Sequence, residues 1–440
     1  MTIRLNATLV VGLLLCLSAV PARADAIPEE LPPTGTIDAV DAQARTIMFR
    51  PDGSKGTKTL PLDESVDPAG IPVGSRVIVN IKERNGQSVV LDATEMFVTL
   101  TPTLFIALII VGLVGGMLSG FIGSGGAFVM TPSMMSLGIP GVVALASNMC
   151  HKFPKALVGA YRRYRYGQAD LKLGLVIGVS AIVGVQIGIR VQKAILAAWG
   201  KAGSDLYLSL AYVTILLSFG AYVLYDAWRL WRGGVEVKTS AFAAAIQKIR
   251  IPPVIDFPTA GLKLSVWVTV PVGLASGLLV ATIAAGGLVG VPATIYGLGA
   301  TAIVATATQL VTAFVMGLYG AVYWAIGGFV DIRLTLLILA GSLIGIQFAA
   351  IGTTYVKDYT IKYTMGVAML IVAVSRAAKV PVLLADLHWM SFSDQALGRF
   401  EFVSFWALVM ALFSACAIVF GATVTGMLRA RRNQPARPPQ

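Results

Sequence analysis

The sequence predicts an all-α polytopic membrane protein with two inverted repeats containing broken helices, preceded by a small N-terminal β-barrel-like periplasmic domain. Three observations lead to this fold class. Of the 440 residues, 56% are hydrophobic and 13% are charged, and a soluble protein could not bury that much apolar surface. A glycine-rich apolar motif occurs twice at an offset of 161 residues, which pairs Gly125 with Gly286 and Gly126 with Gly287. Each copy holds five apolar segments, and an odd number of spans inverts the second copy relative to the first.

Residues 1–26 have the pattern of a secretory signal peptide. Arg4 is followed by an apolar core, residues 9–20, and then by the small-residue cleavage site Ala22-Arg23-Ala24 or Ala24-Asp25-Ala26. The apolar core is short for a membrane span, so we expect cleavage. An uncleaved anchor is the alternative, and it leaves the following segment on the same side of the membrane.

Residues 27–98 are polar and rich in turns, and they predict a periplasmic β-domain. Short strands are expected around residues 36–40, 46–49, 77–81 and 89–91, with hairpin turns at Asp52-Gly53 and Asn85-Gly86. The pattern resembles a small barrel of the OB-like kind. It has no basic and aromatic patch of the sort that binds nucleic acid, so an accessory role is expected for it.

The rest of the chain is mostly apolar and falls into two similar sets of segments. The first transmembrane repeat, residues 103–225, and the second, residues 264–377, flank a hydrophilic linker, residues 226–263, which we expect in the cytoplasm. An additional transmembrane helix over residues 401–425 precedes a basic cytoplasmic tail, residues 426–440. The apolar runs are 103–123, 124–138, 141–160, 171–190 and 205–225, then 264–283, 284–298, 300–323, 334–352 and 361–377.

Positive charges set the orientation of these segments. If the chain enters the membrane from the periplasm near residue 103, the basic loop at residues 162–172, the linker and the tail all fall in the cytoplasm. The loops at Asp170 and Asp331 then lie on opposite sides of the membrane, and each aspartate is expected to cap the helix that follows it. Two inverted copies provide two alternative packings of one site, which is the physical basis of alternating access.

A glycine-rich break interrupts one long apolar run in each repeat. The breaks are Gly123-Ser124-Gly125-Gly126 and Ala284-Ala285-Gly286-Gly287, followed by Pro132 and Pro292. Glycine lets the chain leave helical dihedral angles, and proline disfavours a continuous helix. Backbone N–H groups freed at such a break can bind an anion, provided that the break lines a cavity. Close helix packing through small residues is the alternative interpretation.

The third segment of the first repeat carries cations in apolar surroundings. Helical spacing places Asn148, Lys152 and Lys155 on one face, with His151 beside them. An ammonium group inside a membrane is costly and is usually functional. The corresponding face of the second repeat is polar but uncharged, and there Thr308 and Gln309 are expected to complete the wall of the site. The alternative is that the span starts later and both lysines reach an interface.

Residue types that are missing exclude several classes of function. Residues 103–160 and 264–323 contain neither Asp nor Glu, which argues against a cation substrate. Three cysteines and two histidines support neither a disulfide framework nor a metal centre, and we expect no cofactor. The net charge of +12 lies mostly in short loops between apolar runs, which argues against nucleic-acid binding. The chain offers no paired acids and no nucleophile with a base, so an enzyme is not expected.

The motifs themselves resemble the TauE/SafE sulfite exporter family over residues 103–377. The similarity lies in Gly123-Ser124-Gly125-Gly126, Gly138-Ile139-Pro140, Ala146-Ser147-Asn148 and the segment from Tyr161 to Asp170, and it extends to residues 284–287 and 323–331 of the second repeat. The resemblance implies a bacterial inner-membrane permease for sulfur-containing anions such as sulfite or organosulfonates. Two segments, His151-Lys152-Phe153-Pro154-Lys155 and Ala284-Ala285-Gly286-Gly287, depart from the commoner pattern, so the identity of the anion and the direction of its flux stay open.

The sequence therefore predicts a multi-pass inner-membrane protein that moves a small sulfur-containing anion through the bilayer by alternating access. The expected substrate-binding residues are Ser124, Gly125, Gly126, Asn148, His151, Lys152, Lys155, Gly286, Gly287, Thr308 and Gln309. A coupling proton on His151 or a coupling ion stays open, as does a homodimer. The alternative function is a membrane-anchored sensor or assembly factor whose periplasmic β-domain binds a partner.

Overall fold

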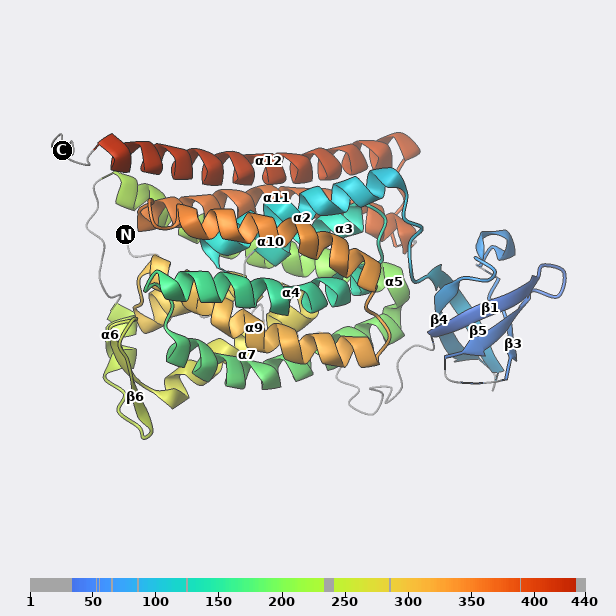
Figure 1. The fold of residues 1–440 in the computed structure, drawn as a ribbon. Helices are drawn as coiled ribbons and strands as arrows, with labels where there is room; N and C mark the ends of the chain where they lie inside the picture. Colours follow the sequence, from blue (N-terminus) through green and yellow to red (C-terminus); the bar gives the residue numbers. More distant parts are fainter. Residues whose placement is uncertain are drawn as a thin grey trace. The chain divides into compact units, whose positions relative to one another are not determined.

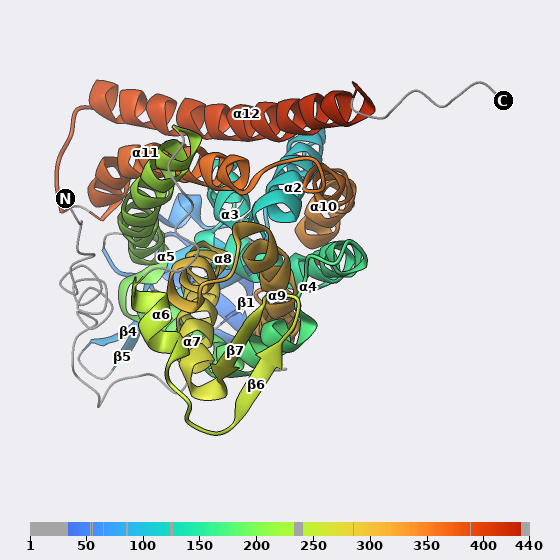
Figure 2. The same ribbon diagram turned by 90° about the vertical axis from the view of Figure 1, so that its left-hand side faces the viewer.

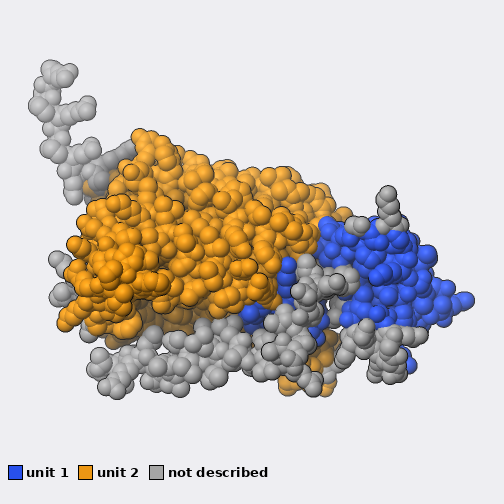
Figure 3. Space-filling model, turned by 90° about the horizontal axis from the view of Figure 1, so that it is seen from below, with its two compact units in different colours: residues 1–96, 191–207 blue, residues 97–190, 208–440 orange. Residues whose placement is uncertain are grey.

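The computed structural model describes residues 34–52, 54, 56–64, 66–84, 87–123, 126–232, 241–284, 286–387 and 389–432. The chain divides into two compact units (Figure 3), of which one comprises residues 1–96 with 191–207 and the other residues 97–190 with 208–440. The predicted signal peptide, Ser124, Gly125 and the last residues of the basic tail lie outside the described part of the chain.

The first unit contains a five-stranded sheet in the order β3-β2-β1-β4-β5, in which neighbouring strands are antiparallel. The strands are β1 (Thr34–Asp41), β2 (Thr46–Pro51), β3 (Lys58–Pro61), β4 (Arg76–Arg84) and β5 (Gln87–Glu95), and a short 3-10 turn, η2 (Pro68–Gly70), precedes β4. Leu62, just after β3, forms a parallel bridge with Val90 of β5, so the two outer strands of the sheet also meet.

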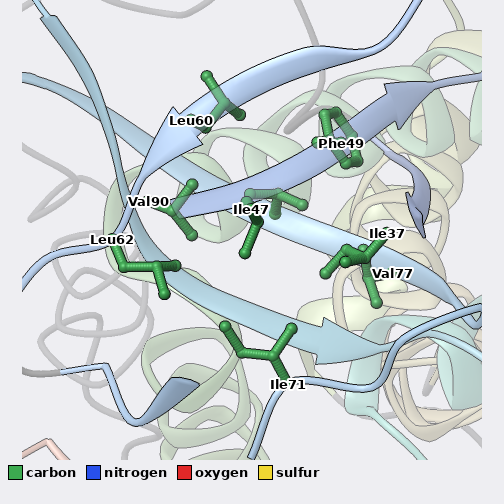
Figure 4. Packing of buried hydrophobic residues seen from close by; sticks show 9 residues of the cluster. Ile37, Ile47, Phe49, Leu60, Leu62, Ile71, Val77 and Val90 are labelled. Carbon is green, nitrogen blue, oxygen red and sulfur yellow. The ribbon is translucent and has the colours of Figure 1, made fainter. Parts of the chain in front are cut away.

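The core of this sheet follows from alternation along the strands. In β2, Ile47 and Phe49 are buried while Met48 between them is exposed, because successive side chains in a strand point to opposite faces. Figure 4 shows these two side chains gathered with Ile37 and Val77 in one apolar cluster. Strand β3 was not expected from the sequence, since its four residues bury only Leu60. Gly53 and the expected turn Asn85-Gly86 lie outside the described residues.

The second unit is a bundle of helices (Figure 1), and among the described residues seven helices are long and apolar enough to cross a membrane. Those seven are α2 (Pro102–Ile122), α5 (Leu171–Trp231), α7 (Val266–Ile283), α9 (Ala302–Ile326), α10 (Ile332–Gly352), α11 (Asp358–Asp386) and α12 (Asp394–Arg432). The remaining elements are α3 (Ala127–Ser136), α4 (Gly141–Arg165), α6 (Ala241–Gln247), the hairpin β6 (Val254–Phe257) and β7 (Leu262–Ser265), α8 (Gly286–Pro292) and the π-helical turn η4 (Ala293–Leu298). The chain is therefore a multi-pass, mostly helical membrane protein.

Helix α5 is interrupted once. Its 61 residues include Gly200, whose φ of 64° and ψ of −165° are not helical. A straight helix of that length would extend about 90 Å, three times the thickness of a bilayer's hydrocarbon core. Gly200 therefore divides α5 into two segments, where the sequence had suggested a longer loop between runs ending at residue 190 and starting at residue 205.

Two helix pairs pack so closely that backbone touches backbone. A Cβ atom on Gly116 of α2 would lie 2.4 Å from the carbonyl oxygen of Ser342 in α10, and one on Gly277 of α7 would lie 2.0 Å from that of Ala181 in α5. These two contacts are related by the same offset of 161 residues. The offset also relates three further pairs of contacts: Gly112–Ile338 with Gly273–Ile177, Leu113–Gly345 with Leu274–Gly184, and Gly159–Leu310 with Met149–Gly320.

Directions of packing follow from these contacts. Helices α2 and α10 run parallel, because residues 112, 116 and 120 meet residues 338, 342 and 346 in order. Helices α4 and α9 run antiparallel, because Met149 meets Gly320 while Gly159 meets Leu310. Figure 2, which looks along the bundle, shows α2 beside α10 and α4 beside α9, with α3 and α8 in the interior.

The two repeats differ by one residue at the break. Helices α2 and α7 end 161 residues apart, but Gly126 and Gly286, which are 160 apart, take equivalent places beside Gly115 and Ser276. Pro132 and Pro292 are also 160 residues apart. The missing residue is restored by the turn η4, since a π-helical turn holds one residue more than an α-helical one, and Gly138 and Gly299 are again 161 apart. The expected pairing of Gly126 with Gly287 is therefore corrected to Gly126 with Gly286.

The close approach of α2 and α10 leads to a first prediction. Replacing Gly345 with Ala places a methyl group 2.0 Å from the Leu113 carbonyl oxygen, a backbone atom that cannot move alone. We expect this variant to lose about 1–3 kcal/mol of stability, measured as a lower thermal midpoint in detergent. Gly421→Ala in α12 is the matched control, because nothing lies within 4 Å of the added atom. Equal midpoints for the two variants would contradict the packing.

Candidate functional site

Two helices end inside the bundle, and the candidate site is built around their ends. Helix α2 ends at Ile122 and is followed by Gly123 with a φ of +87°, a conformation that favours glycine. Helix α7 ends at Ile283 and is followed by Ala284 in the left-handed region, with a φ of +56°, which is uncommon for a residue with a Cβ atom. A Cβ atom on Gly123 would lie 3.2 Å from the Val291 side chain of α8, so the first break lies against the second broken helix.

The last carbonyl groups of both helices receive hydrogen bonds from buried side chains. Arg163 of α4 donates to the Gly120 carbonyl oxygen at 3.2 Å. At the end of α7, the Tyr212 hydroxyl donates to the Ile283 carbonyl oxygen and the Lys152 ammonium donates to that of Ala284, the latter at 3.2 Å. A helix leaves its last four carbonyls without partners, and inside an apolar core water cannot supply the missing donors.

Helix α4 brings one lysine to each break. Lys152 reaches Ala284 beside the second break, whereas Lys155 donates to the Ser119 hydroxyl of α2 at 2.9 Å. Ser119 adjoins the first break, because a Cβ atom on Gly126 would lie 2.5 Å from its hydroxyl oxygen. The exposed fraction of Lys152 is 0% and that of Lys155 is 1%, so neither ammonium group reaches an interface. The alternative that both lysines extend to an interface is therefore wrong.

Asn148 and His151 occupy the same region of α4. The Asn148 amide donates to the Ala127 carbonyl oxygen at 3.1 Å and to the Thr131 hydroxyl at 2.7 Å, so it holds the start of α3. His151 Nδ1 lies 2.9 Å from the Asn148 carbonyl oxygen. Its Nε2 atom is buried and has no hydrogen-bond partner within the described ranges. That nitrogen is therefore available for a hydrogen bond with a bound molecule.

Two buried lysines dominate the electrostatics of this region. None of the ion pairs found among the described residues includes Lys152 or Lys155. Two cations buried within one helical turn repel each other and have lost their hydration, so an anion placed between them would offset both costs. No cluster of His, Cys, Asp or Glu that could hold a metal ion occurs in the described part of the chain.

Thr308 and Gln309, the two residues expected in the wall on α9, have different surroundings. The Thr308 hydroxyl accepts a hydrogen bond of 3.0 Å from the Asp170 backbone, and the Ser147 hydroxyl accepts one of 3.0 Å from the Asp331 backbone at the related position. Gln309 instead faces α8, where its amide meets Gly290. Asp170 and Asp331 accept from Leu173 and Arg333, which confirms both expected helix caps.

Two broken helices, α2 with α3 and α7 with α8 and η4, each form a side-chain hydrogen bond at their far end. The sequence did not identify the residues that make these bonds. Ser136, at the end of α3, accepts a hydrogen bond of 2.8 Å from Arg376 of α11. Tyr296 of η4 donates to Asp226 of α5 at 2.8 Å, and the same carboxylate oxygen pairs with Lys362 of α11 at 2.9 Å. Asp226 and Lys362 stand close to the ends of apolar runs in the sequence, so they resembled ordinary loop charges.

Arg163 is a further buried cation that the sequence did not identify. Besides Gly120 it contacts the Thr306 hydroxyl at 3.0 Å and the Ile303 carbonyl oxygen at 2.8 Å on α9, and the Gln168 amide oxygen at 2.8 Å. Its hydrogen-bonding capacity is thus used by the protein itself. Arg163 is a structural clamp between α2 and α9, unlike the two lysines.

Comparisons with known proteins identify the family of this chain. The family model described as sulfite exporter TauE/SafE matches residues 108–376, which is more than half of the 440 residues. The probable membrane transporter protein YdhB of Bacillus subtilis (strain 168) is 37% identical over 81 residues, which cover 18% of this chain and 33% of that relative. The matched stretch thus spans a third of the relative's length, and no solved structure matches significantly. On the strength of the family match, the chain belongs to the TauE/SafE sulfite exporter family of membrane transporters.

Proposed function

We propose that this transporter is a permease for a small sulfur-containing anion, of the sulfite or organosulfonate class, and that it works by alternating access. One observation carries the proposal: Lys152 and Lys155 are fully buried without a carboxylate partner in the described residues, and each meets a helix break. A family of sulfite exporters supplies the class of anion. The β-domain and the bundle then belong to one inner-membrane protein with its N-terminal domain in the periplasm and its tail in the cytoplasm.

Each residue of the site has a distinct role in this proposal. Lys152 and Lys155 attract the anion and balance its charge. Asn148 keeps α3 in position through Ala127 and Thr131. His151 Nδ1 donates to the Asn148 carbonyl oxygen, so Nε2 binds the anion only when it also carries a proton, the candidate coupling proton. Backbone donors come from the two breaks, at Ser124, Gly125, Gly126, Gly286 and Gly287. Gln309 completes the wall on α9, whereas Thr308 anchors the Asp170 loop.

Alternating access rests on the two halves being inverted repeats, and three observations support that relation. Contacts between helices recur at an offset of 161 residues. Helices α4 and α9, which are counterparts, pack antiparallel. Asp170 bonds near the start of α9 and Asp331 near the start of α4, so the two loops lie at opposite ends of this antiparallel pair. A pair of inverted halves can exchange two equivalent packings around one central site.

The ties at the ends of the broken helices are the contacts that such an exchange has to break. Arg376–Ser136 holds the end of α3, and Asp226 with Lys362 holds Tyr296 at the end of the second broken helix. Both are hydrogen bonds with one charged partner: a guanidinium donates to a hydroxyl at α3, and a hydroxyl donates to a carboxylate at η4. The ion pair between Asp226 and Lys362 joins α5 to α11 and keeps that carboxylate in place.

The β-domain is proposed to be a closed barrel of the OB-like kind. The strand order β3-β2-β1-β4-β5 and the parallel bridge between Leu62 and Val90 support this, because five strands in this order close when β3 meets β5. An accessory role outside the membrane suits a domain whose core is built only of aliphatic and aromatic side chains.

Flux through proteoliposomes tests the function. We expect the protein to move sulfite, and Lys152→Ala and Lys155→Ala each to lower the rate about tenfold or more, because each removes a charged hydrogen-bond donor from a buried site. Lys379→Ala is the matched control, since its ammonium pairs with the exposed Glu401 at 2.7 Å. Flux rates equal to that of the parent protein in both lysine variants would show that the lysines are not part of the site. A parent protein that moves no anion would favour the sensor alternative.

Cysteine labelling tests the inverted topology. Arg165→Cys and Ile326→Cys place thiols at positions 161 residues apart, both exposed, in a chain whose Cys16, Cys150 and Cys416 are replaced by Ala. We expect a membrane-impermeant thiol reagent to label Cys at position 326 in intact cells and Cys at position 165 only after lysis. Labelling of both thiols from one side would exclude inverted repeats.

A double-mutant cycle measures the tie at the second broken helix. Lys362→Met leaves the Asp226 carboxylate buried, and we expect a loss of about 3 kcal/mol, at the lower end for a broken buried pair because Tyr296 and Arg229 still contact it. Adding Asp226→Asn should recover most of that loss. Denaturation in detergent gives both values, and strict additivity of the two single changes would show that the charges do not interact.

A further inference from the structure

The second broken helix, α7 with α8, lacks the large side chain that packs between the two halves of the first, α2 with α3. In the first repeat, a Cβ atom on Gly115 of α2 would lie 2.4 Å from the end of the Met130 side chain, so Met130 of α3 fills the space beside α2. In the second repeat Ser276 takes the place of Gly115, and Gly290 takes the place of Met130. The large side chain is missing there and a hydroxyl group has been added.

Two polar groups face the bare backbone of Gly290. A Cβ atom on Gly290 would lie 2.7 Å from the Ser276 hydroxyl oxygen, and 2.5 and 2.7 Å from the oxygen and nitrogen of the Gln309 amide. The groups come from three elements, α7, α8 and α9, and converge on one point. The exposed fraction of Ser276 is 0% and that of Gln309 is 1%.

Neither group is satisfied by the protein. The Ser276 hydroxyl and the Gln309 amide nitrogen have no hydrogen-bond partner within the described ranges. Neighbouring hydroxyl groups behave differently: Thr282 donates to Leu278 and Thr294 donates to Gly290, both to carbonyls one turn earlier in the chain. A buried donor without a partner is costly in an apolar core, and two that converge on one point indicate a missing acceptor.

In the first repeat the related amide nitrogen has partners within the protein, whereas the Asn148 amide oxygen has none among the described residues. Asn148, the counterpart of Gln309, places its amide nitrogen on Thr131 and Ala127 of the broken helix. Gln309 has no hydroxyl to bind on α8, because Val291 and Gly290 occupy that region. The second repeat therefore has the donors of a binding site without the protein acceptors that the first repeat supplies.

We propose that Ser276 and Gln309 form a second, uncharged subsite, which binds an oxygen atom of the transported oxyanion. This inference rests on the proposed function and adds a division of labour to it. The lysines of α4 balance the charge of any small anion, whereas the hydroxyl and amide donors on α7 and α9 are directional and match the oxygen of a sulfite or sulfonate group. Gly290 is required because a Cβ atom there would lie within 2.7 Å of the Ser276 hydroxyl and the Gln309 amide and would displace both groups.

Binding to the purified full-length protein in detergent tests the subsite, with sulfite as the probe and chloride as the comparison. We expect Ser276→Ala to weaken sulfite binding about tenfold, the value for loss of one hydrogen bond to a charged group, and to leave chloride binding unchanged. Gly290→Ala should act in the same direction, because the added methyl group displaces the Ser276 hydroxyl and the Gln309 amide. Ser342→Ala is the matched control, because that buried hydroxyl already donates to Leu339 of its own helix.

The possible results separate this inference from the proposed function. If Ser276→Ala and Gly290→Ala both bind sulfite as tightly as the parent protein, while Lys152→Ala loses binding, the subsite is overturned and the lysine site stands. Ser276 would then bind only water. Equal weakening of sulfite and chloride also overturns it, because the donors would not select oxygen. A parent that binds no oxyanion overturns the proposed function and the subsite with it. The thermal midpoint without ligand identifies any variant that fails to fold, and Gln309→Leu then replaces it.

Discussion

Two helices of this protein end in the middle of an apolar core, and the rest of the bundle is arranged to satisfy those ends. Water cannot reach the last carbonyls of α2 and α7, so donors have to come from neighbouring helices. Arg163 supplies one for α2, and Lys152 and Tyr212 supply them for α7. Because the donors at α7 include an ammonium group, the same constraint that stabilises the break also brings a positive charge to it.

Duplication provides the frame, and divergence of side chains provides the chemistry. Glycine contacts between α2 and α10 recur between α7 and α5, so the backbones of the two repeats pack alike. The cations do not recur: Lys152 corresponds to Ala313, Lys155 to Met316 and Arg163 to Trp324. Trp324 packs edge-on against Phe329 where Arg163 bonds Gln168, so an aromatic contact replaces a polar one at the same place. Backbones that pack alike thus carry different side chains in the two repeats.

Features that depend on local pattern could be predicted from the sequence, whereas features that depend on partners could not. The helix ends near residues 122 and 283 follow from glycine and proline within apolar runs, and the lysine face follows from helical spacing. That Lys152 contacts Ala284, 132 residues away, depends on the packing of α4 against α7. Asp226 and Lys362 could not be predicted for the same reason. Each is an isolated charge in the sequence, and their contact with each other and with Tyr296 depends on the packing of three helical segments.

The one-residue difference between the breaks explains why the second repeat has polar groups where the first has a methionine. An α-helix turns by about 100° per residue, so a slip of one residue rotates every side chain of α8 by that angle. At an unbroken offset of 161 residues, Val291 would stand where Met130 stands and would cover Ser276. The slip instead turns Val291 toward Gly123 at the first break and leaves Gly290 facing Ser276 and Gln309. Since η4 restores the register within one turn, α9 and its polar face keep their place, and the change is confined to the wall of the site.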